Sequence, residues 1–422
     1  MSNTIVCFGP GPQFKGGISN YNTSLAKALE KKGDCNVHIV SWTQQYPAII
    51  PREFKDLKSK GDLLEGTKIK VTYITNYNNP FSWISTIKLI KSLNPSKVIF
   101  QWSIALQGLP LGYIAKRLKR TKIEVIFDLH FVIQKENSSI DQYLTKMGIK
   151  HADTFLVHAF KTYDELKELF PTKNFVLTED GKRETKSGKA VIKLFHPIYD
   201  LFQPDPNFDT ESFKNKYGLK KNVFLYFGFI RKYKGLHNVI KAFAELSKER
   251  DDVSLLVCGE SFWNTLDSNK MSTKIKEALF GFAKGLFLSK SDDEKNYNPI
   301  ALIDELNLQD KTAVFNEFIP NEDVHKYFQV SDCILLFYLY ATPSGIESLS
   351  YNFDMPLIAT NVGHFPETIK DGFNGFLAEP ENIEDMKNKM IQFLENPISR
   401  SNVAQAKEQM SWAKYVDAIM LS

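Results

Sequence analysis

Two basic residues stand three positions apart in the loop 229–235, directly after the apolar run 223–228. The planar guanidinium group of Arg231 can bind two oxygens of a phosphate side by side, and the ammonium group of Lys234 adds a compact positive charge. We therefore interpret Arg231 and Lys234 as a clamp for a diphosphate. The alternative is a pair of solvated surface cations, which is the default interpretation for isolated basic residues.

A second anion-binding feature is predicted within the stretch 340–380. The apolar run 333–337 has the length and content of a buried parallel strand, and the small polar turn Thr-Pro-Ser-Gly follows it at 342–345. Such a turn leaves backbone N–H groups free at the start of a helix, where the helix dipole attracts anions. Thr342, Ser344 and Gly345 are therefore candidate donor-binding residues. An ordinary connection between a strand and a helix of an α/β fold explains the same turn about equally well.

The beginning of the chain follows a similar plan. The pattern predicts a strand over residues 4–8, a glycine-rich loop and then a helix over about 18–32. The loop is not a good dinucleotide fingerprint, because Phe14 stands where the third glycine should be, and we therefore discount NAD. Gly16 and Gly17 lie at the helix start, where the absence of side chains lets backbone N–H groups approach a phosphate or a sugar.

Other candidates stand at the predicted carboxyl ends of strands, where open parallel sheets place their ligands. His130 follows an apolar run, as do Gly228, Gly259 and Glu260. We assign His130 a hydrogen bond to the donor sugar or the acceptor, and the other three a role in donor binding. A purely structural role for His130 is equally compatible with its position. Alternating strands and helices in both halves predict an α/β fold.

Length and composition set the limits of these interpretations. A chain of 422 residues exceeds one ordinary core, and we predict an N-terminal domain over 1–200, a C-terminal domain over 201–405 and a last helix within 406–422. The composition, 43% hydrophobic and 24% charged, is typical of a soluble globular protein. No run approaches the ~18 apolar residues of a membrane span, and no signal peptide is visible. The four cysteines are scattered, which indicates reduced thiols and a cytoplasmic location.

Charge is distributed unevenly between the two halves. Residues 1–200 contain 29 Lys and Arg against 18 Asp and Glu, whereas residues 201–422 contain 24 against 31. A basic half suggests an anionic partner. No nucleic-acid-binding motif is present, so a peripheral contact with an anionic membrane or a phosphate-bearing acceptor fits better than nucleic acid. Solvated lysines are the simpler alternative. Within an apparent insertion at 264–300, the basic amphipathic segment 275–290 is either a membrane-surface helix or an additional packed helix.

The order and spacing of these motifs resemble those of the retaining GT-B glycosyltransferases of family 4. The resemblance is carried by the segments GPGPQFKGGISNYNTSLAKAL, SWTQQYP, DLHFVIQKE, FHPIYDLF, YFGFIRKYKGL, CGESFW, FIPNED and ATPSGIE through DGFNGFLAEP. It implies two Rossmann-like domains that face a central cleft, a UDP- or GDP-sugar bound by the second domain, and a last helix that crosses back to the first. It implies no metal and no cofactor. The implied acceptor is a saccharide or a lipid-linked saccharide, in surface-polysaccharide synthesis.

The chain also departs from this family. Most members have two glutamates separated by seven residues, and these positions are Ala341 and Leu349 here. Glu347 lies two residues away from the second position, and it either replaces that glutamate at the donor ribose or only caps a helix. Phe229 stands where the family has an arginine, and Arg231 follows two residues later. A Ser-Gly branch of the family resembles this chain in lacking both glutamates, so these departures do not by themselves imply loss of activity.

The resemblance therefore implies transfer of a hexose from a nucleoside-diphosphate sugar to a hydroxyl group with retained anomeric configuration. Arg231, Lys234 and the N–H groups near 344–345 would stabilise the leaving diphosphate. Two alternatives are kept: a nucleotide-sugar epimerase of the same fold, and a non-catalytic partner subunit. Product analysis with and without acceptor separates the first alternative from transfer, and binding of nucleoside diphosphates separates the second.

Overall fold

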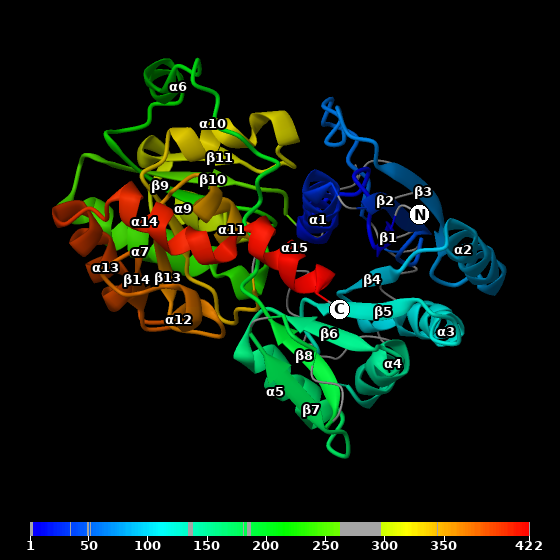
Figure 1. Ribbon diagram of the computed structural model, residues 1–422. Coiled ribbons are helices and arrows are strands. Elements are labelled where there is room, and N and C mark those ends of the chain that lie inside the picture. The colour runs from blue at the N-terminus through cyan, green and yellow to red at the C-terminus, as the bar shows by residue number, and fades with distance from the viewer. Residues whose placement is uncertain are drawn as a thin grey trace.

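An eight-stranded parallel sheet organises the first half of the chain, with the strand order β3-β2-β1-β4-β5-β6-β8-β7 (Figure 1). Its strands are β1 (Asn3–Phe8), β2 (Cys35–Gln44), β3 (Lys70–Asn76), β4 (Lys97–Trp102), β5 (Glu124–Leu129), β6 (Thr154–Val157), β7 (Phe175–Thr178) and β8 (Lys189–Lys193). Apolar clusters cover both faces of the sheet. Burial on both sides explains why these strands are nearly continuous apolar runs, and β4 is buried throughout.

Helices pack on the two faces of this sheet. The helix α1 (Gly17–Lys32) packs on the face that carries Ile5 and Cys7. The opposite face, which carries Val6 and Phe8, is covered by α2 (Pro80–Leu93), α3 (Gly108–Leu118), α4 (Ser139–Ile149) and α5 (Phe160–Leu169). Because each helix connects parallel strands, the helices run antiparallel to the strands and begin at the edge of the sheet where the strands end.

A six-stranded parallel sheet organises the second half, with the order β11-β10-β9-β12-β13-β14. Its strands are β9 (Asn222–Phe227), β10 (Val253–Cys258), β11 (Thr312–Phe315), β12 (Cys333–Leu336), β13 (Leu357–Thr360) and β14 (Gly375–Ala378). Before the last helix, the described residues of this half form the helices α6 (Thr210–Lys216), α7 (Leu236–Glu249), α9 (Ala301–Glu305), α10 (Val324–Gln329), α11 (Gly345–Asn352), α12 (Phe365–Thr368), α13 (Ile383–Glu395) and α14 (Arg400–Lys407). The predicted α/β class with two Rossmann-like domains is confirmed.

The strand order reverses at the same place in both sheets, between β1 and β4 and between β9 and β12. In open parallel sheets such a reversal leaves a crevice outside the carboxyl ends of the strands, where ligands bind. The last strand of the first sheet ends at Lys193 and the first strand of the second begins at Asn222, so the predicted boundary near residue 200 falls in the connection between them.

The computed structural model describes residues 3–33, 35–48, 50, 52–133, 138–179, 181–183, 187–261, 297–343 and 345–421. The predicted amphipathic segment 275–290 and the candidate site residue Ser344 lie outside these residues. Among the helices that are described, none is long and apolar enough to cross a bilayer.

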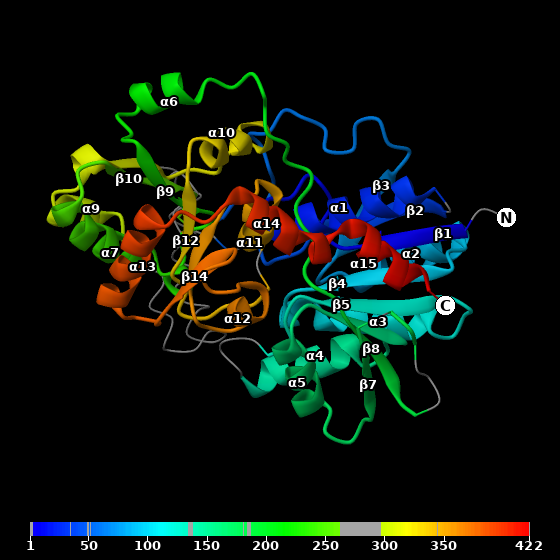
Figure 2. The ribbon, with the colours of Figure 1, turned by 60° about the vertical axis from the view of Figure 1, so that its left-hand side comes forward.

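The helix α15 (Trp412–Met420) packs against α1, so the end of the chain lies beside its beginning (Figure 2). The Trp412 ring lies 5.3 Å from the ring of Tyr21, centroid to centroid. The Tyr415 hydroxyl donates a 2.9 Å hydrogen bond to a carboxylate oxygen of Asp128 at the end of β5. The helix thus joins the two halves of the protein.

Asp128 is the centre of a buried polar network behind the strand ends. Its carboxylate accepts hydrogen bonds from Tyr21 at 2.9 Å and from Tyr415, and the Nε2 atom of His158 lies 2.8 Å from its other oxygen. Burial alone would raise the pKa of Asp128, but the neighbouring His158 imidazole and these hydrogen bonds outweigh it and lower the pKa to about 2. The carboxylate therefore stays ionised at neutral pH.

The contact between Tyr415 and Asp128 generates a prediction about stability. Tyr415→Phe removes one donor to a buried carboxylate, and hydrogen bonds to charged groups contribute about 1.5–3 kcal/mol. We expect a loss of this size in the free energy of unfolding, measured by denaturant titration, and faster proteolysis of the last helix. Tyr143→Phe, at a tyrosine that is 60% exposed on α4, is the matched control and should change neither. Equal stability of the two variants would contradict the importance of this hydrogen bond.

Candidate functional site

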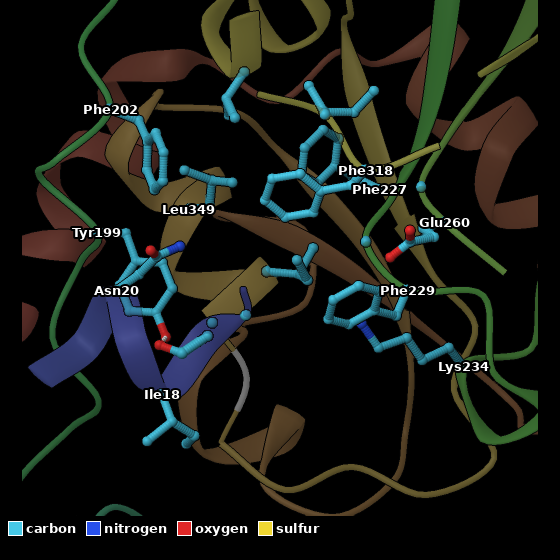
Figure 3. Close-up of a pocket in the computed structure, with 18 of the residues that line it drawn as sticks. Ile18, Asn20, Tyr199, Phe202, Phe227, Phe229, Lys234, Glu260, Phe318 and Leu349 are labelled. Atoms are coloured by element: carbon cyan, nitrogen blue, oxygen red, sulfur yellow. Dashed lines mark hydrogen bonds between the residues drawn. The ribbon is translucent and has the colours of Figure 1, made fainter. Parts of the chain in front are cut away.

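A cleft of about 290 Å³ lies where strand ends of the two sheets face each other (Figure 3). Ile18 and Asn20 of α1 border it on one side, and Phe229, Lys234 and Glu260 border it on the other. The wall combines residues that follow strands of both sheets with residues of the connection between the domains. The site is therefore formed jointly by the two halves of the chain.

Most of the predicted site residues meet in this cleft. The members of the predicted set that line it are Gly16, Gly17, His130, Gly228, Lys234, Gly259, Glu260, Thr342 and Gly345. Arg231 and Glu347 are not part of the lining, and Ser344 lies outside the described residues although both of its neighbours line the cleft. The sequence thus predicted residues that the fold brings into one cleft, while the role of each residue in binding remains a prediction.

Lys234 is a buried basic residue on the wall of the cleft. It is 7% exposed, and burial first, then the positive charge of Arg231, lower its pKa to about 7. Within the described part of the chain, no carboxylate lies within ion-pair distance of its ammonium group. A buried cation without an opposite charge is costly, and anions bind readily at such a position.

Arg231 stands beside Lys234 but does not share its place in the cleft. Its guanidinium carbon lies 5.2 Å from the centre of the Tyr233 ring, and it is close enough to lower the pKa of Lys234. Of the two residues predicted to clamp a diphosphate, Lys234 lines the cleft and Arg231 does not, and the clamp itself stays a prediction. The effect of Arg231 on the cleft is that its positive charge lowers the pKa of Lys234.

The glycines at the strand ends are required by close approach of the backbone. Gly259 has a φ of +151°, and a Cβ atom there would lie 1.9 Å from the carbonyl oxygen of Gly228. Gly228 itself has a φ of +105°, and a Cβ atom there would lie 3.0 Å from the Nζ atom of Lys234. Side chains at these positions would displace the chain that holds Lys234 in place.

The starts of two helices approach the cleft from opposite domains. No side chain caps the N-terminus of α1 at Gly16, so its first N–H groups face the cleft without a side-chain acceptor. Gly345 begins α11 on the other side, and the Tyr199 hydroxyl between them donates a 2.7 Å hydrogen bond to the carbonyl oxygen of Gly17. Two helix dipoles with their positive ends at one cleft favour an anion there.

His130 is buried beside the cleft and is uncharged at neutral pH. Burial lowers its pKa to about 4, although the Asp128 carboxylate opposes the shift, and His158 lowers it further. One ring nitrogen lies 2.8 Å from the amide oxygen of Gln101. A neutral imidazole in this position supplies a hydrogen bond to a ligand, and its predicted contact with a sugar or acceptor is compatible with this geometry.

Glu260 lines the cleft, but its carboxylate is already paired with the first domain. The Nζ atom of Lys15 lies 3.1 Å away and a guanidinium nitrogen of Arg52 lies 3.9 Å away. The Arg52 guanidinium also lies 4.1 Å above the ring of Phe229. Glu260 therefore forms an ionic link between the domains at the edge of the cleft, and its contact with the donor stays a prediction.

Glu347 is directed away from the cleft. It is 3% exposed, and its carboxylate lies 2.5 Å from Nε2 of His364 and accepts a hydrogen bond from the Thr368 hydroxyl. These contacts fix α11 to α12. This placement gives no support to Glu347 as a substitute for the family's ribose-binding glutamate. Leu349, at the family position itself, does line the cleft.

Sequence reasoning missed four residues that help to form the site. His196 and Tyr199 line the cleft from the connection between the domains, where the sequence was interpreted only as a linker. The ring of His196 is buried and lies 2.7 Å from the Ser348 hydroxyl. Lys15 and Arg52 bind Glu260. Of these four residues, only Lys15 could have been proposed from the sequence, because it stands next to the glycine pair Gly16 and Gly17.

Comparison with known proteins supplies a family for the second half of the chain. The family model of the glycosyl transferases group 1 matches residues 207–410. The chain is 22% identical over 312 residues to the N-acetyl-alpha-D-glucosaminyl L-malate synthase of Bacillus anthracis, which covers 72% of this chain and 67% of that protein. Across the curated relatives that it matches, the aligned part spans from 18% to 67% of the relative's length.

Solved structures extend the similarity to the whole chain. Anabaena HepE in complex with UDP and glucose has a TM-score of 0.67 at 14% identity and covers 99% of this chain and 98% of its own. A Listeria monocytogenes protein assigned as a UDP-N-acetylglucosamine 2-epimerase has a TM-score of 0.56 at 12% identity, and covers 100% and 95%. At these identities the likeness shows the fold alone. Residues 207–410 thus form a glycosyl transferases group 1 domain, and the chain as a whole shares the fold of these solved structures.

Proposed function

We propose that the protein transfers a hexose from a nucleoside-diphosphate sugar to a hydroxyl group of a saccharide or lipid-linked acceptor, with retained anomeric configuration. The observation that carries the proposal is Lys234, a buried cation on the cleft wall whose described surroundings contain no carboxylate partner. A bound diphosphate would supply the missing negative charge. Its other oxygens would accept from the N–H groups at the start of α1 and, across the cleft, of α11.

The apolar part of the cleft suits the nucleoside. Phe227 and Phe318 lie together on one wall, with Leu349 and Phe202 nearby (Figure 3). An aromatic surface binds a nucleobase by stacking, and does so for more than one base. Because Leu349 stands where most of the family has a glutamate, the ribose would meet an apolar side chain here. A UDP- or GDP-sugar is the proposed donor, and the Anabaena HepE structure, which holds UDP and glucose, supports the first of these.

In the proposed reaction the bond between the anomeric carbon and the β-phosphate oxygen breaks, and the nucleoside diphosphate leaves with the electron pair. The acceptor hydroxyl forms the new bond to the anomeric carbon on the same face, and its proton passes to the departing diphosphate. Lys234 and the backbone N–H groups stabilise the charge that develops on the leaving group. His130, held by Gln101, orients the sugar or the acceptor through a hydrogen bond.

Product analysis tests this proposal against an epimerase of the same fold. The protein is incubated with UDP-glucose and other nucleotide sugars, alone and with saccharide or lipid-linked acceptors, and the products are analysed by NMR. Transfer with retention gives a new glycoside of the donor's anomeric configuration only when acceptor is present. An epimerised nucleotide sugar formed without acceptor, or an inverted glycoside, would overturn the proposal.

Replacement of Lys234 generates the next prediction. Lys234→Met removes a charged hydrogen bond of about 1.5–3 kcal/mol to the diphosphate, so the Kd for UDP-glucose should rise roughly 10- to 100-fold, with an equal or larger loss of kcat/KM. The same change removes a buried cation that has no carboxylate partner among the described residues, so the ligand-free protein should melt at a higher temperature. Lys241→Met, at an exposed lysine of α7, is the control and should change neither quantity. Unchanged binding in Lys234→Met would exclude this lysine from the donor site.

The pKa of Lys234 predicts how donor binding depends on pH. The diphosphate of UDP-glucose binds the protonated lysine, whose pKa in the free protein is about 7. Affinity should therefore be constant well below pH 7 and fall by up to tenfold per pH unit above it. Arg231→Ala removes a neighbouring positive charge, so it should raise the pKa of Lys234 and shift this fall to higher pH. Isothermal titration calorimetry across the pH range measures both, and a pH-independent Kd would contradict the assignment.

A further inference from the structure

The outer layer of the first domain has an unusual charge distribution. Residues 66–123 contain ten Lys and Arg and no Asp or Glu. This stretch includes all of α2 and α3, which lie side by side, and α4 packs against α3 (Figure 1). The only acidic residue of α4 is Asp141. The layer therefore presents a strongly basic surface, far from the acidic second half of the chain.

The same three helices also expose large apolar side chains. Phe81 is 80% exposed and Ile84 is 41% exposed on α2, Leu109 is 48% exposed on α3, and Ile140 and Tyr143 are 70% and 60% exposed on α4. These five are half of the large hydrophobic residues that are exposed in the described part of the chain. Exposed apolar side chains concentrated in one layer indicate a contact surface.

Apolar and basic residues occupy opposite ends of these helices. Each of the five apolar residues lies in the first two turns of its helix. The exposed basic residues follow in the last turns or just beyond: Lys88, Lys91, Lys116, Arg117, Lys119, Arg120, Lys122 and Lys146. On α3, Leu109, Tyr113 and Arg117 are spaced by four and share one side of the helix. Because α2, α3 and α4 all begin at the edge where the strands end, the apolar ends form one band and the basic ends another.

We infer that this surface, α2–α4, docks on an anionic lipid bilayer. Apolar side chains enter the boundary between headgroups and acyl chains, and lysines and arginines behind them bind the headgroups. Charge complementarity favours a membrane over an apolar protein partner, and the apolar band favours it over a polyanion such as nucleic acid. The apolar band lies on the same edge of the sheet as His130, so docking would bring the cleft near the membrane surface. The inference concerns a surface outside the cleft and does not depend on the reaction proposed above.

Vesicle sedimentation tests this inference on the full-length chain. Binding is measured to vesicles of phosphatidylcholine alone and of phosphatidylcholine mixed with an equal amount of phosphatidylglycerol. We expect binding to the anionic vesicles only, weakened by added salt because headgroup attraction is screened. Wild-type protein that binds both vesicles equally, or neither, would overturn the inference.

Two variant sets separate the apolar from the basic contribution. The apolar set combines Phe81→Ser, Ile140→Ser and Tyr143→Ser, and the basic set combines Lys116→Gln, Arg117→Gln, Arg120→Gln and Lys122→Gln. We expect partitioning to fall more than tenfold for the first set and by about fivefold for each charge removed in the second. Unchanged partitioning of the apolar set would show polyanion recognition rather than bilayer docking and would overturn the inference.

Matched controls place the same chemistry on the second domain. They are Leu306→Ser with Val314→Ser, and Lys216→Gln with Lys220→Gln, Lys221→Gln and Lys241→Gln, all at exposed positions. They should partition like the wild type, and an equal loss in the controls would also overturn the inference. Melting temperatures verify folding, and the thermal shift with UDP-glucose should persist in every variant. Loss of vesicle binding with an intact UDP-glucose shift keeps the donor site separate from the docking surface.

Discussion

All strands in the two sheets that the structure describes run parallel, and this shared direction determines where the loops of each domain lie. In a parallel sheet every strand ends at the same edge. The direction of the strands alone therefore places the glycine turns, the helix starts and the side chains at the strand ends along that edge. Turning two such edges toward each other produces the cleft. Gly16, Lys234 and Gly345 come from distant parts of the chain and line one cavity for this reason.

Two charged groups on the same side of the cleft have different surroundings. Glu260 pairs with Lys15 and Arg52, and these ion pairs link the two domains. Lys234 is buried beside the positive charge of Arg231, and both effects lower its pKa. The protein thus links its domains by ion pairs and keeps Lys234 where the negative charge of a ligand can pair with it. The buried charge of Lys234 lowers the stability of the ligand-free protein at the position where an anion would bind.

The sequence predicted the fold and most of the candidate residues that line the cleft, because both follow from local patterns. Apolar runs marked the strands, and the glycines and small polar residues after them marked the loops. Pairings between distant residues had no such signal. Arg52 is one basic residue among many until the fold brings it to Glu260, and Glu347 belongs to the correct helix but to its buried side. His196 was hidden in a segment whose proline content indicated a linker. Lys234 lines the cleft and Arg231 does not, and the spacing of the two residues could not decide between them.

The hydrogen bond from Tyr415 to Asp128 links residues 287 positions apart. The first domain is synthesised before the second, and its strands and helices can assemble while the second is still being translated. The Tyr415 hydroxyl, which donates to the buried carboxylate of Asp128, is nevertheless synthesised only with α15. The amino-terminal half therefore completes its interior last, and a chain that terminates before the final helix would leave this aspartate short of a partner in a region that water cannot reach.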